Sequence, residues 1–146
     1  MTFRAYFYKG TRPELLAGAF NRAVRLIDDG KYSHMEIEFS DGWSFSSSFM
    51  DGGVRKKRIS YDLSRWDYID LPEEWEESVR WKAEARILRG THYDVAGIFW
   101  QAISFPRQHD DKDSCSEFCF SILGMEQEAW RITPNGGHAI LRWILL

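Results

Sequence analysis

Alternating apolar and polar residues on both sides of an Asp-Gly pair constrain the fold most strongly. Between residues 33 and 49 the pattern has a period of two, and Ser40-Asp41-Gly42 separates its two halves. A period of two indicates strands, because successive side chains of a strand point to opposite faces, and an Asp-Gly pair between two strands indicates a hairpin. This segment therefore predicts an antiparallel hairpin. A three-residue turn predicts a register in which Phe39 pairs with Trp43, Glu36 with Ser46 and His34 with Ser48.

The remaining elements separate into strands followed mostly by helices. Strands are expected at residues 2–9 and 66–71, and a second hairpin-like return is expected from Gly52-Gly53. Helices are expected at residues 11–30, 72–90, 94–103, 114–123 and 133–143, with a polar loop at 105–113. This segregation favours an α+β fold, and 146 residues without repeats or linkers fit a single domain, 1–146.

Charge and composition exclude several classes of partner. The formal net charge is −3, so no overall positive field attracts a nucleic-acid backbone, and nucleic acid is not an expected partner. No apolar run approaches the roughly 20 residues of a membrane-spanning helix, and no signal peptide is evident. Two cysteines are too few for a disulfide-based secreted scaffold. A cytoplasmic location is the default expectation, with a virion as the alternative.

A cysteine at the expected start of a helix is the first candidate for chemistry. Ser114 and Glu117 have the spacing of a capping box, which makes Cys115 the first helical residue. The positive end of the helix dipole stabilises a thiolate there, and the thiolate is the nucleophilic form. The alternative is a small buried residue that merely begins a helix. Cys119 lies among apolar residues and is expected to be inert; a zinc site that uses both thiols and a histidine lacks the usual turn-borne spacing.

His34 is the best-placed candidate base, because a strand fixes its direction. The alternation puts His34 and Glu36 on the face opposite the core, where Ser46 is a diagonal neighbour within reach of the imidazole. The alternative is an ordinary solvated face of the sheet. His92, His109 and His138 have no comparable geometric support.

Three motifs together carry a resemblance to a known superfamily. Residues 32–39 read Tyr-Ser-His-Met-Glu-Ile-Glu-Phe before the Asp-Gly turn, residues 88–94 read Leu-Arg-Gly-Thr-His-Tyr-Asp, and residues 114–118 read Ser-Cys-Ser-Glu-Phe. In this order they resemble the circularly permuted branch of the NlpC-type papain-like superfamily, which includes the YiiX-like proteins and the lecithin retinol acyltransferase group. The resemblance implies a permuted papain-like fold, in which an antiparallel sheet packs against helices and the nucleophile helix lies near the C-terminus.

The same resemblance implies roles for individual residues. Cys115 matches the family nucleophile and His34 the family base. The third polar position of the family usually lies on the next strand, about a dozen residues after the histidine, where this chain has Ser46, Ser47 and Ser48. A serine hydroxyl orients an imidazole but does not stabilise imidazolium as a carboxylate does, so Glu36 is the alternative third residue.

The implied activity is that of a cysteine hydrolase without a metal or cofactor. It would cleave an amide or peptide bond, with bacterial cell-wall peptide as a substrate class, through an acyl-enzyme on Cys115. One alternative is a lipid-directed acyltransferase or thioesterase acting on an acyl ester at the same site. Another is a catalytically degenerate structural module, for instance one that binds other proteins in a phage tail.

A short basic run is the remaining feature that suggests a partner. Residues 55–58 read Arg-Lys-Lys-Arg beside the Gly-Gly pair, and Lys9 adds a further cation. The favoured interpretation is a solvated loop, and the alternative is contact with a phosphate or an anionic wall polymer.

Overall fold

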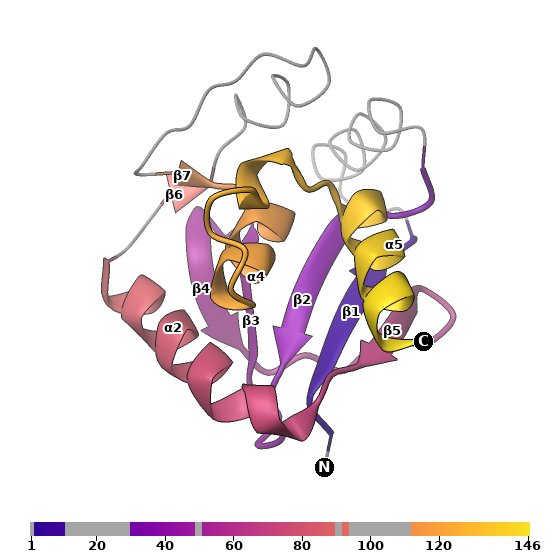
Figure 1. The fold of residues 1–146 in the computed structure, drawn as a ribbon, viewed down its shortest axis with the longest axis horizontal. Helices are drawn as coiled ribbons and strands as arrows, with labels where there is room; N and C mark the ends of the chain where they lie inside the picture. The colour runs from indigo at the N-terminus through magenta and orange to yellow at the C-terminus, as the bar shows by residue number, and fades with distance from the viewer. Residues whose placement is uncertain (1, 11–29, 49–50, 90–91, 94–111) are drawn as a thin grey trace.

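A five-stranded antiparallel sheet lies at the centre of the computed structural model, which describes residues 2–10, 30–48, 51–89, 92–93 and 112–146 (Figure 1). The spatial order of its strands is β4-β3-β2-β1-β5. The strands are β1 (Arg4–Tyr8), β2 (His34–Glu38), β3 (Ser44–Ser48), β4 (Gly53–Lys57) and β5 (Trp66–Asp70). The fold is α+β, as expected from the sequence.

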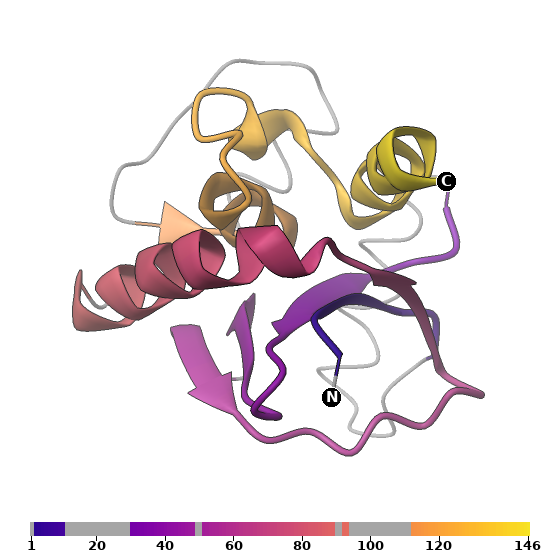
Figure 2. The same cartoon turned by 60° about the horizontal axis from the view of Figure 1, so that its bottom comes forward.

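The described helices cover one face of this sheet (Figure 2). They are η1 (Glu73–Trp75), α2 (Glu76–Arg89), α4 (Cys115–Ile122), η2 (Ala129–Arg131) and α5 (Pro134–Leu145). A short parallel pair, β6 (His92–Tyr93) with β7 (Lys112–Asp113), precedes α4. The polar loop expected at 105–113 therefore ends in a strand over its last two residues. Helix α4 contacts β2 and β3, and this contact brings the candidate nucleophile to the candidate base.

The predicted first hairpin is confirmed near its turn. Ile37 pairs with Phe45 and Glu38 with Ser44, and the Phe39 N–H donates to the Trp43 carbonyl oxygen at 2.9 Å. This is the predicted register. The expected pairs further from the turn, Glu36 with Ser46 and His34 with Ser48, are not part of the β2–β3 ladder, so the two strands separate there. The second hairpin is also confirmed, as β4 pairs with β3 along its whole length.

The core lies between the sheet and the helices. Aromatic side chains from both layers are fully buried there, among them Phe7, Phe45, Phe118 and Phe120. Helix α2 packs an apolar stripe against this core. Val79 and Ala83 are buried, and Ile87 of α2 and Trp75 of η1 are partly buried. Burial of these rings contributes to the hydrophobic stabilisation of the domain.

Part of the opposite face of the sheet is covered, and His34 is buried there, which corrects the alternative interpretation of a solvated face. A second apolar cluster of Tyr6, Tyr8 and Trp66, with Tyr61 packed against it, covers this face. The rings of Tyr6 and Tyr61 stack with their centroids 3.6 Å apart. His34 and Glu36 are therefore buried on this face rather than solvated.

The basic run at residues 55–58 is also not a solvated loop. Three of its residues belong to β4, and all four cations interact with acceptors within the protein. Arg55 binds Glu36, Lys56 binds Glu84, Lys57 binds Asp51, and Arg58 donates to the Asp41 carbonyl oxygen. The four cations of the run thus have acceptors within the protein, and contact with an anionic partner, the alternative interpretation, stays a prediction.

Two later helices expected from the sequence are present, and several other expected elements lie outside the described residues. Residues 114–123 and 133–143 were expected to be helical, and α4 and α5 confirm this. The expected helices at 11–30 and 94–103 lie outside the described residues, as do most of the expected loop at 105–113 and His109. Among the residues that the structure describes, no helix combines the length and apolar character needed to span a bilayer.

Candidate active site

Cys115 is the first residue of α4, as the capping box predicted. The Ser114 hydroxyl accepts from the Glu117 N–H at 3.2 Å, and the Ser114 N–H donates to the Glu117 carboxylate at 3.4 Å. The backbone N–H groups of the first helical turn lack intrahelical acceptors, and the helix dipole is positive there. Cys115 is a free thiol in a site that favours negative charge.

The separation of β2 from β3 makes room for the helix beside His34. Beyond the Ile37–Phe45 pair, the Met35 carbonyl oxygen accepts a hydrogen bond from the Ser46 hydroxyl at 2.6 Å. The Cys119 thiol approaches the same oxygen at 3.8 Å. Residues 115 and 119 are one turn apart on α4, so the helix side that carries both thiols faces the opening between the strands. In this way helix α4, which lies on the core face of the sheet, comes close to the His34 side chain, which belongs to the opposite face.

The structure brings the Cys115 thiol and the His34 imidazole into contact. Burial of His34 favours its neutral form, but the negative charge of a Cys115 thiolate, its hydrogen bond to the ring and the neighbouring Glu36 together outweigh burial. The pKa of His34 is therefore raised above its ordinary value. This environment favours the imidazolium form of His34.

Glu36 is the residue that orients the imidazole. Its Oε1 lies 2.7 Å from His34 Nε2, which leaves Nδ1 as the ring nitrogen available to the thiol. Arg55 binds the same carboxylate through both terminal nitrogens, with Nη1 2.7 Å from Oε2 and Nη2 against Oε1. Desolvation alone would raise the pKa of Glu36, but Arg55 and His34 lower it to about 2. Glu36 is therefore a carboxylate whenever the protein is folded near neutral pH.

Arg55 is in turn held by an acidic side chain nearer the surface. Its Nε donates to the Asp51 carboxylate at 2.8 Å, and Lys57 binds the same carboxylate at 3.0 Å. Sequence reasoning missed Arg55. The signal that could have revealed it is the pairing of β3 with β4, because Arg55 lies opposite Ser46 and thus on the same face as Glu36.

The first-choice orienting residue, Ser46, does not reach the imidazole. Its hydroxyl donates to the Met35 carbonyl oxygen and lies 3.3 Å from the Ser47 carbonyl oxygen. The alternative third residue, Glu36, takes the place next to the ring. A residue two positions along the same strand projects from the same face, and this proximity explains the contact.

Cys119 has the environment of an inert thiol. It is completely buried, and desolvation, with the nearby charges of Cys115 and Glu36, raises its pKa well above the ordinary value. In the part of the chain that the structure describes, no group of three or more His, Cys, Asp or Glu side chains is arranged to bind a metal ion.

Access to Cys115 is narrow. The residue is 2 % exposed and the His34 side chain 7 % exposed, and the Trp66 ring lies edge-on to the imidazole with centroids 6.3 Å apart. A site this dry strengthens electrostatic interactions within it, and it admits small reagents more readily than large ones.

Comparison with known proteins adds no family assignment. The sequence matches no protein-family model and has no significant match among curated proteins.

Proposed function

We propose that the protein is a cysteine hydrolase of the permuted papain-like type, which cleaves an amide or peptide bond through an acyl-enzyme on Cys115. The observation that supports this most directly is the buried series Cys115–His34–Glu36, with the sulfur at the beginning of a helix. A nucleophile, a base and a residue that orients the base are the parts that covalent acyl transfer needs.

The chemistry follows from the positions of these groups. The Cys115 thiolate attacks the carbonyl carbon, and the carbonyl π electrons move to oxygen, where backbone N–H groups at the start of α4 stabilise the oxyanion. The oxyanion collapses, the bond to the leaving nitrogen breaks, and His34 gives its proton to the departing amine. Neutral His34 then removes a proton from water, which attacks the thioester and releases the acid and the thiolate.

Glu36 has two tasks in this sequence. It fixes the ring by accepting a hydrogen bond from Nε2, and its negative charge stabilises the imidazolium that precedes attack. A hydroxyl in this position would perform only the first task. The carboxylate therefore favours an active site over a degenerate structural module.

The test uses Cys115→Ala and, as a matched control, Cys119→Ala. Incubation with p-nitrophenyl acetate should transfer one acetyl group to the protein, detected as an increase in intact mass, with release of p-nitrophenolate. We expect acetylation in the wild type and in Cys119→Ala, and none in Cys115→Ala. Acetylation that persists in Cys115→Ala, or a wild type that is neither acetylated nor releases p-nitrophenolate faster than Cys115→Ala, would contradict the proposal.

Comparison of substrate classes then separates the alternatives. Turnover of short peptide amides supports the hydrolase. Turnover confined to long-chain acyl esters or thioesters would instead identify the lipid-directed acyltransferase or thioesterase.

A further inference from the structure

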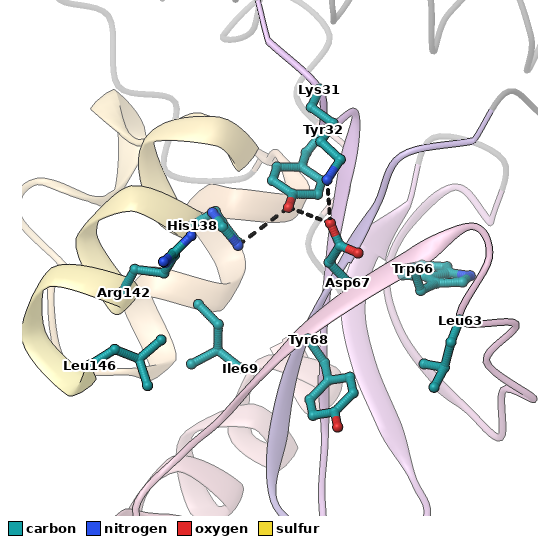
Figure 3. Close-up of a pocket in the computed structure, with 10 residues that line it drawn as sticks. All are labelled: Lys31, Tyr32, Leu63, Trp66, Asp67, Tyr68, Ile69, His138, Arg142 and Leu146. Atoms are coloured by element: carbon teal, nitrogen blue, oxygen red, sulfur yellow. Dashed lines mark hydrogen bonds and ion pairs between the residues drawn. The ribbon is translucent and has the colours of Figure 1, made fainter.

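A second cleft lies at the far edge of the sheet and has a volume of about 420 Å³ (Figure 3). Four consecutive residues of β5, from Trp66 to Ile69, contribute to its lining. Neighbouring side chains of a strand point to opposite faces, so a cleft that includes all four must run along the free edge of β5. Among the described residues, no strand pairs with this edge.

The hydrogen-bond pattern shows which backbone groups point into the cleft. The Lys9 N–H donates to the Arg65 carbonyl oxygen, and the Leu71 N–H donates to the Phe3 carbonyl oxygen. In an antiparallel pair such bonded positions alternate, so Tyr68, which lies between them in the register, directs its N–H and C=O away from β1. The Tyr68 backbone has no partner among the described residues and can pair with one residue of an added strand.

Charged groups gather on the α5 side of this edge. Asp67 accepts from Tyr32 Oη at 2.6 Å and from Lys31 Nζ at 2.7 Å, while Lys9 Nζ binds its other oxygen at 2.6 Å. Desolvation opposes ionisation of Asp67, but these donors outweigh it and hold its pKa well below the ordinary value. Asp67, the one acidic side chain among the described lining residues, thus already accepts from three donors of the protein itself.

Arg142 adds a cation that no acidic side chain balances. Within the part of the chain that the structure describes, its guanidinium makes no hydrogen bond or ion pair. Together with burial, its charge lowers the pKa of His138, whose Nε2 lies 3.3 Å from Tyr32 Oη. Among the described residues that line the cleft, the side chains of Lys31 and Arg142 are cationic and that of Asp67 is acidic, so these side chains leave one excess positive charge.

We propose that this edge cleft binds an extended acidic peptide, which adds to β5 as an antiparallel or parallel strand. One residue of the peptide pairs with the backbone of Tyr68, and an Asp or Glu side chain of a neighbouring residue points to the α5 side, towards Arg142 and Lys31. The free backbone groups supply affinity that does not depend on sequence, and the unbalanced cations supply the preference for acid. The proposal does not depend on the chemistry of Cys115.

The test is a titration of the ¹⁵N-labelled full chain with the peptide acetyl-Thr-Val-Thr-Glu-Thr-Val-amide, followed by amide chemical shifts and hydrogen exchange. We expect the largest shifts at Tyr68 and Asp70, and slower exchange of the Tyr68 amide. The same peptide with Gln in place of Glu should bind about threefold to fivefold more weakly, because an exposed ion pair contributes up to about 1 kcal/mol.

Variants distinguish recognition of the peptide's charge from non-specific binding. Arg142→Gln should remove most of the difference between the Glu and Gln peptides. Arg131→Gln, a matched change at an arginine that is 62 % exposed and lies outside the cleft, should preserve it. Equal binding of the two peptides to the wild type, shifts that avoid Tyr68, or no binding at about 5 mM peptide would overturn the proposal.

Discussion

Replacement of Glu36 by glutamine tests whether the carboxylate holds His34 as an imidazolium. The amide has nearly the same shape and can still accept a hydrogen bond from Nε2 through its oxygen. It carries no charge, however, so it stabilises imidazolium much less than the carboxylate does. We therefore expect the pKa of His34 to fall in Glu36→Gln, and Cys115 to be alkylated more slowly.

The size of the expected change in the alkylation rate follows from the strength of the hydrogen bond between Glu36 and His34. A hydrogen bond to a charged group contributes about 1.5–3 kcal/mol, which corresponds to roughly tenfold to a hundredfold in an equilibrium constant. Arg55 already neutralises part of the Glu36 charge, so the lower end of this range applies. At pH 6 the alkylation rate of Cys115 should therefore fall about tenfold.

The assay measures alkylation by iodoacetamide between pH 5 and pH 10, with peptide mapping to separate the two thiols. Cys119→Ala is the control, since its Cys115 should react at the wild-type rate. Loss of Glu36 leaves Arg55 with only Asp51 as a carboxylate partner, which costs about 3–5 kcal/mol in buried pairs, so the folded fraction is measured in parallel.

A second variant gives the opposite sign and does not depend on the stability of the first. Arg55→Met removes the cation that competes with His34 for the Glu36 carboxylate, so the pKa of His34 should rise and Cys115 should become more reactive at pH 5. The reasoning is refuted if folded Glu36→Gln reacts at the wild-type rate at pH 6, or if both variants shift the profile in the same direction.

Three further predictions concern stability. The pKa of Glu36 is about 2 in the folded protein against an ordinary 4.5, so ionised Glu36 contributes roughly 3 kcal/mol to the free energy of unfolding. This contribution is present above pH 4.5 and is lost as the pH falls towards 2. Urea unfolding at a series of acidic pH values measures it, and Glu36→Gln should lack this component. Ser114→Ala removes the cap of α4 and should cost about 1 kcal/mol and slow alkylation of Cys115, whereas equal stability and reactivity would argue against the role of the cap. Gly137→Ala normally favours a helix, but here its methyl group would overlap the Phe120 ring, so thermal unfolding should show a loss of about 1–3 kcal/mol instead of a gain.

Features with a local physical cause could be predicted from the sequence. The Asp-Gly turn fixes the hairpin register near residues 37–45, and the Ser114–Glu117 pair fixes the start of α4, because each interaction involves residues a few positions apart. The helical stripe of α2 follows from the same kind of periodicity.

The remaining features depend on segments far apart in the chain. Burial of His34 and Glu36 requires the aromatic cluster on the second face of the sheet, to which Tyr61 and Trp66 contribute. Alternation on β2 assigns these side chains to that face but does not say what covers it. The partnership of Glu36 with Arg55 likewise depends on the β3–β4 register, and a basic run viewed without that register looks like a surface loop.

In the proposed mechanism, alternating charge compensates the thiolate–imidazolium pair in this buried place. An isolated buried ion is costly, because little water remains to solvate it. Here each charge has a neighbour of opposite sign, and the exposed fraction of the side chains rises from 1 % at Glu36 to 11 % at Arg55 and 32 % at Asp51. The series therefore carries charge compensation from the buried sulfur to the solvent, and removal of any middle member leaves two like or unpaired charges behind. On this argument, the arginine that β4 supplies compensates the charge of the carboxylate on the side away from the histidine.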